Sequence, residues 1–178
     1  LQLIKDKRVS DIMYIRSPVE SSDSKIGFLP GDADEKLKYY NLPFADKLDE
    51  LLSKPSIESL NNQGRLQSHP LSFVRGMSWN CKAIILDEAQ NCTQKEIVTL
   101  MTRIGEFSKC FILADPDQSD LAYGKSGGFE KLQAIFSDEE SRERGLYSFH
   151  FTEEDIKRSD LVKFIVKKLK VLSPTVRV

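Results

Sequence analysis

The feature that most constrains the fold is a short apolar run that ends in two adjacent carboxylates. Residues 83–91 read AIILDEAQN, so four apolar side chains lead directly into Asp87 and Glu88. An unbroken apolar run of this length is typical of a strand that is buried on both faces of a parallel sheet. Open α/β sheets bind their ligands at the carboxyl ends of such strands. We therefore expect Asp87 and Glu88 to lie at the ligand-binding edge of an α/β fold.

A second apolar run with the same ending follows a clearly marked helix. Thr93–Glu96 has the S/T-x-x-E form of a capping box, and apolar residues at helical spacing lead to Gly105. The next apolar run, 110–114, ends at Asp115, with Gln118 three residues later. Because parallel strands end at a common edge, Asp115 and Gln118 are expected to lie beside the first pair of acids. The plainer interpretation is a proline turn that Asp115 caps.

The rest of the chain alternates helices with strands, which favours a parallel sheet with right-handed crossovers. We expect strands at 11–15 and 147–151, and an edge strand or a loop at 70–76. Further helical segments are expected at 1–7, 35–54, 129–136 and 161–172, and Pro43 should split or kink the second of them. Segment 137–145 is expected to be a charged loop, and 55–69 a polar loop with room for a short helix near 57–61. The residues of the last helix that should face the core are Leu161, Ile165, Leu169 and Leu172.

Composition argues for an ordinary globular protein with a single domain over residues 1–178. Of these residues 40% are apolar and 30% are charged. The net charge of −1 gives no overall attraction to nucleic acid, and no apolar run reaches the roughly 18 residues of a membrane span. The three cysteines are odd in number and lack C-x-x-C spacing. This pattern favours free thiols in a reducing cytoplasm over disulfides or a zinc site.

Two arginines and a glycine-rich segment each allow a functional and a plainer interpretation. Arg103 ends the capped helix and Arg158 precedes the last helix, so either could stabilise a phosphoryl-transfer transition state or be a surface cation at a helix end. Gly124–Ser126 resembles the end of a phosphate-binding loop, but position 119 is serine where G-x-x-x-x-G-K-[ST] needs glycine. It also follows a strand that is not the first of the fold. We therefore interpret it as unrelated to phosphate binding.

Taken in order, these residues resemble the PhoH-like family of P-loop ATPases. The most specific matches are D-E-A-Q-N, the family's Walker B signature, at 87–91, G-F-L-P-G-D at 27–32 and T-R-I-G at 102–105. The weaker matches are R-P-x-x-E at 16–20, P-L-x-x-x-R-G at 70–76, G-D-x-x-Q-x-D-L at 114–121 and D-V-V-R at 155–158. D-E-A-Q alone also occurs in other helicase-like ATPases, but the ordered set is much more specific.

The resemblance implies a RecA-like α/β fold, related to superfamily 1 helicases, in which a mainly parallel sheet forms the middle layer of a three-layer sandwich. It implies ATP and Mg²⁺ as cofactors and hydrolysis that is coupled to remodelling of RNA or single-stranded nucleic acid. It also implies assembly into homo-oligomeric rings, in which a neighbouring subunit contributes an arginine to each site. No membrane partner is implied.

The resemblance also assigns roles to single residues. Asp87 would bind Mg²⁺, through water, and Glu88 would activate the attacking water. Gln118 would sense the γ-phosphate, and Gln90 and Asp115 would be further contacts on the nucleotide side. The candidates for the completing arginine are Arg103 and Arg158.

This sequence departs from the family pattern in three places. Ala114 replaces the glycine before Asp115, and Ser17 replaces the proline after Arg16. The larger departure is that the Walker A loop, which should precede Leu1, is absent from the 178 residues. We therefore expect this chain to be the C-terminal portion of a P-loop ATPase domain. The alternative is a non-hydrolytic remnant that acts as a binding or ring-assembly module.

Overall fold

The computed structural model describes residues 1–16, 33–119, 128–152, 155, 157 and 159–169. The chain divides into two compact units, Leu1–Leu132 and Gln133–Val178. Within the described ranges, no helix combines the length and the apolar character that crossing a bilayer requires.

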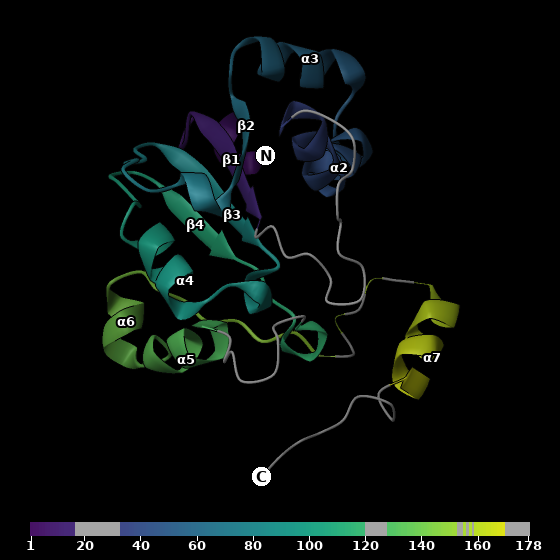
Figure 1. Cartoon of the computed structure of the whole chain (residues 1–178), viewed down its shortest axis with the longest axis vertical. Coiled ribbons are helices and arrows are strands. Elements are labelled where there is room, and N and C mark those ends of the chain that lie inside the picture. The colour runs from purple at the N-terminus through teal and green to yellow at the C-terminus, as the bar shows by residue number, and fades with distance from the viewer. Residues whose placement is uncertain (17–32, 120–127, 153–154, 156, 158, 170–178) are drawn as a thin grey trace. The chain divides into compact units, whose positions relative to one another are not determined.

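The first unit is built on a sheet of four parallel strands in the order β2-β1-β3-β4 (Figure 1). The strands are β1 (Asp11–Arg16), β2 (Leu66–Pro70), β3 (Lys82–Asp87) and β4 (Lys109–Ile112). The all-parallel sheet confirms the α/β prediction. The register sets Arg16 at the end of β1 opposite Asp87 at the end of β3.

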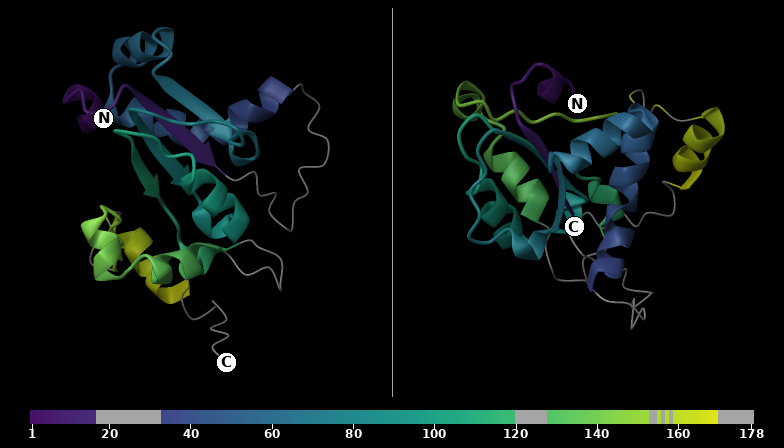
Figure 2. Two further views of the ribbon diagram at one scale, coloured as in Figure 1. Left: turned by 90° about the vertical axis from the view of Figure 1, so that its left-hand side faces the viewer. Right: turned by 90° about the horizontal axis from the view of Figure 1, so that it is seen from above.

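The helical connections leave the two central strands in opposite directions. From β1 the chain passes through α2 (Ala33–Leu51) and α3 (Lys54–Asn62) to β2, whereas β3 leads through α4 (Gln94–Met101) to β4. Right-handed crossovers then place α2 and α4 on opposite faces of the sheet, as Figures 1 and 2 show. The carboxyl ends of β1 and β3 therefore form a topological switch point, where open α/β sheets bind ligands.

Burial of the two central strands explains their apolar sequences. Ile15, Ile84 and Leu86 are completely buried, as expected of strands that have a helix on each face. On α4, Leu100 and Ile97 complete this core. The capping box predicted at the start of α4 is present, because Thr93 and Glu96 each accept the other's backbone N–H.

Three of the predicted segments in the first unit are adjusted by the structure. α1 is shorter than expected (Gln2–Lys5), and α2 is one helix with Pro43 inside it. In the segment predicted as a polar loop at 55–69, the short helix allowed near 57–61 is present within α3, but the loop prediction is wrong for β2. Among the described strands β2 pairs on one side only, so its polar residues can form a strand without being fully buried. Residues 71–73 follow as a short 3₁₀ helix, η1 (Leu71–Phe73).

Two predictions for residues 137–151 are wrong. Segment 147–151 is not a strand: Phe149 is 75% exposed and Phe151 80%, and no described strand pairs with them. The segment predicted as a loop at 137–145 contains α6 (Glu139–Glu143), whose first turn is capped by the Asp138 carboxylate. The helix before α6, α5 (Gly128–Ile135), lies close to the predicted 129–136.

The last helix, α7 (Asp160–Leu169), forms as predicted, but its expected core stripe is wrong where it can be checked. Leu161 is 68% exposed and Ile165 42%. The side chain of Leu169 and all of Leu172 lie outside the described residues. Helical spacing identified an apolar face, but spacing alone does not supply a surface for that face to pack on.

An ion pair near the start of the sheet is expected to make the stability of the fold depend on pH. The Lys82 Nζ lies 2.6 Å from the Asp11 carboxylate, and both side chains are less than 20% exposed. Burial raises the pKa of Asp11, but hydrogen bonds from Lys82 and Ser10 outweigh burial and leave it below its usual 3.8. A lowered folded-state pKa means that the pair stabilises the fold above about pH 4 and that this contribution is lost as the pH falls further.

Urea denaturation at a series of pH values between 2.5 and 7 is the measurement. Asp11→Asn should remove part of the loss of unfolding free energy below about pH 4. An unchanged pH profile in that variant would mean that Asp11 does not titrate differently in the folded and unfolded chains.

Candidate functional site

The two acids at the end of β3 are separated by a sharp turn of the backbone. Asp87 is the last residue of the strand, and Glu88 adopts the left-handed conformation with φ 55° and ψ 41°. This conformation is uncommon for a residue with a side chain and costs on the order of 1–2 kcal/mol. The chain then enters the 3₁₀ turn η2 (Ala89–Asn91). The turn lets two adjacent carboxylates meet different partners.

Asp87 is held by a tyrosine on the neighbouring strand. The Tyr14 hydroxyl donates a hydrogen bond of 2.5 Å to Asp87 Oδ2, while Asp87 Oδ1 accepts the backbone N–H of Glu88. The Tyr14 ring is 5% exposed and stacks on Phe44 of α2, with centroids 4.8 Å apart. Burial, followed by the hydrogen bond to Asp87, raises the pKa of Tyr14, so the phenol remains a donor at all ordinary pH values.

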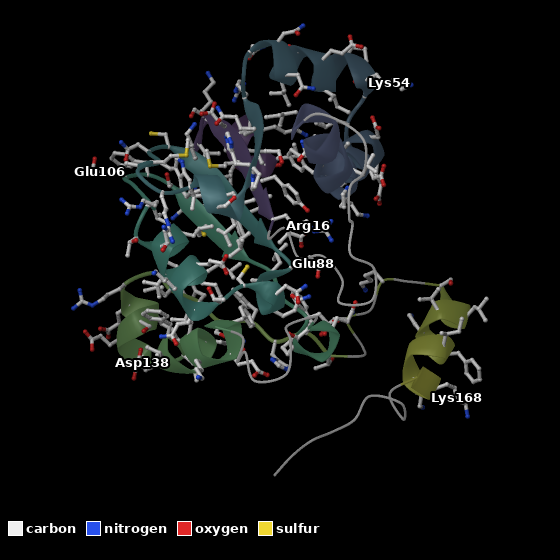
Figure 3. All side chains as sticks on the ribbon, in the orientation of Figure 1. Arg16, Lys54, Glu88, Glu106, Asp138 and Lys168 are labelled. Carbon is white, nitrogen blue, oxygen red and sulfur yellow. The ribbon has the colours of Figure 1, made fainter. Side chains whose placement is uncertain are left out.

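Glu88 has one partner on each carboxylate oxygen. The Arg16 guanidinium lies 3.5 Å from Oε1, and the Gln90 side-chain amide donates to Oε2 at 2.6 Å. Figure 3 shows Arg16 and Glu88 side by side at this end of the sheet. Both side chains remain about one-third exposed, at 29% and 38%. The carboxylate is therefore fixed in orientation but open to solvent.

Gln90 joins the end of β3 to the loop after β4. Its side chain is 4% exposed, its Oε1 accepts the backbone N–H of Asp115 at 3.1 Å, and its Nε2 also lies 3.4 Å from the Gln118 carbonyl. The Ser119 hydroxyl donates to the Gln90 carbonyl. Sequence reasoning treats Gln90 as a nucleotide contact. In the structure its amide group bridges two segments of the chain.

Asp115 and Gln118 lie at the same edge, as their positions in the sequence predicted. Gln118 Nε2 donates to Asp115 Oδ2, and both side chains are exposed. Gln90 connects this pair to Glu88. The structure thus gathers five of the seven predicted site residues at the carboxyl edge of the sheet: Asp87, Glu88, Gln90, Asp115 and Gln118.

The two predicted arginines are not among these residues. The Arg103 carbonyl accepts the N–H of Trp79, which precedes β3, so Arg103 lies at the amino end of the sheet. The length of β3, about 16 Å at 3.3 Å per residue, separates that end from the acids. The Nε of Arg103 is buried and has no hydrogen-bond partner in the described part of the chain. Arg158 lies outside the described residues, as do the segments 124–126 and 27–32.

Sequence reasoning missed the roles of Tyr14 and Arg16. Both residues are in β1, two positions apart, and alternate residues of a strand face the same side. A strand that ends in arginine would predict an ion pair if it were known to lie next to a strand that ends in acids. The sequence does not show that β1 is the neighbour of β3.

Comparison with known proteins gives a consistent result. A family model described as PhoH-like protein matches residues 1–170. The PhoH-like protein of Synechocystis is 31% identical over 157 residues, which cover 88% of this chain and 47% of the relative. The PhoH-like protein of Bacillus subtilis is 32% identical over 164 residues, covering 92% and 50%. Protein PhoH of Escherichia coli is 31% identical over 153 residues, covering 85% and 42%. The chain spans about half the length of these relatives.

Proposed function

The chain belongs to the PhoH-like family, and on this premise we propose that it forms the metal-holding and water-activating part of an ATPase site. The observation that carries the proposal is the geometry of Asp87 and Glu88 at the switch point of the sheet. Hydrolysis of a phosphoanhydride needs a metal ion to neutralise charge and a group that orients or deprotonates water. Two adjacent acids with separate partners match these two tasks.

Asp87 is suited to hold Mg²⁺. Each of its oxygens accepts one hydrogen bond, from Tyr14 or from the Glu88 backbone, and a carboxylate oxygen has a further lone pair to offer. Hard oxygen donors are the ligands that Mg²⁺ prefers, and it keeps several waters when one or two carboxylates bind it. When bound there, the ion would neutralise negative charge on the phosphates.

Glu88 is the proposed general base. Its carboxylate is held by Gln90 and Arg16 yet remains 38% exposed, so an attacking water can reach it. Gln118, at the end of the bridge that Gln90 makes, is the proposed γ-phosphate sensor. This arrangement couples the loop after β4 to the orientation of the base.

The proposed reaction also needs backbone amides and a lysine around the β- and γ-phosphates. No G-x-x-x-x-G-K-[ST] motif occurs within the 178 residues, so the proposal requires a phosphate-binding segment from outside them. β4 offers a place for it. Among the described strands β4 is at one edge of the sheet, and Phe111 and the following Leu113 are 45% and 47% exposed.

We extend the proposal to a cytoplasmic homo-oligomeric ring that couples hydrolysis to remodelling of RNA or single-stranded nucleic acid. Arg103 lies too far from its own acids to act on them, so the proposal gives it a role only between subunits. In a ring it could serve the site of the next subunit, as arginine fingers supplied in trans do.

The experiment is to measure ATP hydrolysis by the full-length gene product with Mg²⁺ and with EDTA, in the presence and absence of single-stranded RNA. Mg²⁺-dependent hydrolysis that RNA stimulates is the expected result. The absence of ATP hydrolysis under all of these conditions would favour the alternative, a non-hydrolytic binding or ring-assembly module.

Tyr14→Phe should raise the Mg²⁺ concentration that the reaction requires without unfolding the protein. The substitution removes the hydroxyl that holds Asp87 and leaves the ring stacked on Phe44. Loss of a group that orients a metal ligand typically weakens metal affinity about 10-fold or more. The measurement is the Mg²⁺ concentration for half-maximal ATPase activity.

The matched control for this substitution is Tyr147→Phe. That tyrosine is 66% exposed and its hydroxyl makes no hydrogen bond to the described residues. Equal Mg²⁺ requirements in the wild type and in Tyr14→Phe would contradict the positioning role of Tyr14.

A further inference from the structure

A cavity of about 720 Å³ lies at the amino ends of the strands, away from the acidic edge. Four of the residues around it precede or begin strands: Ser10 before β1, Arg65 before β2, Cys81 before β3 and Lys109 in β4. Because the strands are parallel, this places the cavity at the opposite end of the sheet from Asp87 and Glu88. In Figure 3, Glu106, next in sequence to the lining residue Phe107, lies far from Arg16 and Glu88.

The lining of this cavity is positively charged. It includes Lys7, Arg8, Arg65 and Lys109 and no carboxylate. The ion pairs among the described residues include none of these four cations. The nearest acid of β1, Asp11, is already paired with Lys82. A chain with a net charge of −1 therefore concentrates four cations around one cavity, none of them in an ion pair with a described residue.

The fold fixes the backbone positions of these cations, and it also fixes the side chain of Arg65. Arg65 Nε donates to the Ser10 carbonyl at 2.7 Å. Lys7 and Arg8 follow α1, whose Leu3 and Ile4 pack on the buried cluster at the start of β1 and β3. Lys109 is the first residue of β4. The ordered Arg65 side chain loses less conformational entropy on binding an anion than a free side chain does.

An exposed aromatic ring lies beside the cations. Phe107 lines the cavity and is 76% exposed. Exposed aromatic rings among basic residues are the platforms on which proteins stack the bases of single strands.

The backbone around the cavity is unusual as well. The described non-glycine residues with positive φ are Lys7, Cys81, Glu88 and Phe107. Three of these four line this cavity, and the fourth is the proposed general base. Such conformations gather at functional sites, where the surrounding structure holds them.

From these observations we propose that the cavity binds the phosphate backbone of a single-stranded nucleic acid, with one base stacked on Phe107. The proposal rests on the nucleic-acid part of the proposed function and is independent of hydrolysis. A free phosphate or mononucleotide shares the anionic chemistry. The four cations, spread over the ends of the strands, match a run of several phosphates better than one, and the exposed ring matches a base.

The test measures binding of fluorescein-labelled single-stranded oligo(U) to the full-length protein by anisotropy, without ATP or Mg²⁺, over a series of salt concentrations. A triple variant, Lys7→Ala, Arg8→Ala and Lys109→Ala, should lower affinity about 10-fold or more and make the slope of log K against log salt less negative by roughly 2. Phe107→Leu should lower affinity about 5-fold or more and leave that slope unchanged, because stacking is not electrostatic.

The matched control removes three exposed lysines that do not line the cavity: Lys54→Ala, Lys95→Ala and Lys131→Ala. It should keep wild-type affinity and slope within about 2-fold. If the two triple variants lost affinity for oligo(U) equally, the proposed location of the site would be wrong. Thermal denaturation of each variant checks that it is folded.

Competition experiments identify the kind of ligand that the cavity binds. If UMP displaces the oligonucleotide at equal phosphate concentration, the cavity is a mononucleotide site. If poly(glutamate) displaces the oligonucleotide as well as unlabelled oligo(U) does, the cavity is a surface for acidic proteins. Either result overturns the proposal, as does a wild-type protein that does not bind oligo(U). Since the binding assay contains no ATP or Mg²⁺, a failure here is distinct from a failure of the proposed ATPase function, which the basal hydrolysis rate reports.

Discussion

Replacing Glu88 with glutamine is expected to lower ATP hydrolysis by the full-length protein about 100-fold or more, since a positioned general base contributes at least that factor. Glutamine has nearly the same shape, so it can keep a hydrogen bond with Gln90, but it cannot accept a proton from water. ATP binding should persist, so the variant should retain bound ATP while turnover stops. The measurements are kcat and the ratio of ATP to ADP bound after single-turnover mixing.

Glu106→Gln is the matched control for this substitution. Glu106 is an exposed glutamate at the other end of the sheet, which Figure 3 shows. Its substitution makes the same chemical change and should leave kcat unaltered. A hydrolysis rate in Glu88→Gln equal to that of the wild type would sink the assignment of Glu88 as the base.

Replacing Gly128 with alanine should lower the free energy of unfolding by about 3 kcal/mol, the upper part of the range for forcing extra volume into a packed site. A Cβ on Gly128 would lie 2.3 Å from the Cα and 2.4 Å from the N of Gln94. These are backbone atoms in the first turn of α4, directly after the capping residue Thr93. They cannot move away without disturbing α4, the helix that follows the turn at Glu88.

The measurement is urea denaturation, with Gly64→Ala as the control. Gly64 has φ +66°, and a Cβ added there would have no atom within 4 Å, so alanine meets only the strain of the left-handed backbone. That strain costs on the order of 1 kcal/mol. If the two variants lost similar amounts of unfolding free energy, the close approach of Gly128 to Gln94 would not be what makes alanine unfavourable at position 128.

Local sequence signals predicted the middle of the first unit well. The apolar run before Asp87, the capping box at Thr93 and the apolar run after Lys109 all lie where the structure has β3, α4 and β4. Each of these signals depends on neighbouring residues alone. Burial on two faces requires a continuous apolar strand, and a helix start requires partners for its free N–H groups.

The predictions that failed needed partners distant in sequence. Residues 67–69 are polar and become part of a strand because β1 offers a backbone to pair with. Residues 147–151 are apolar enough for a strand, yet no described strand pairs with them. Strand formation is therefore decided by the available neighbour as much as by composition.

The candidate site divides in the same way. By itself the sequence determined that two acids lie at the end of a buried strand and that Asp115 and Gln118 follow the next strand, because the side chains near a strand end follow from the order of residues. Only the tertiary structure decided that Tyr14 binds Asp87, that Arg16 pairs with Glu88 and that Arg103 lies at the other end of the sheet. The physical reason is the strand order. Placing β1 beside β3 brings together residues more than 70 positions apart, and no local pattern encodes that contact.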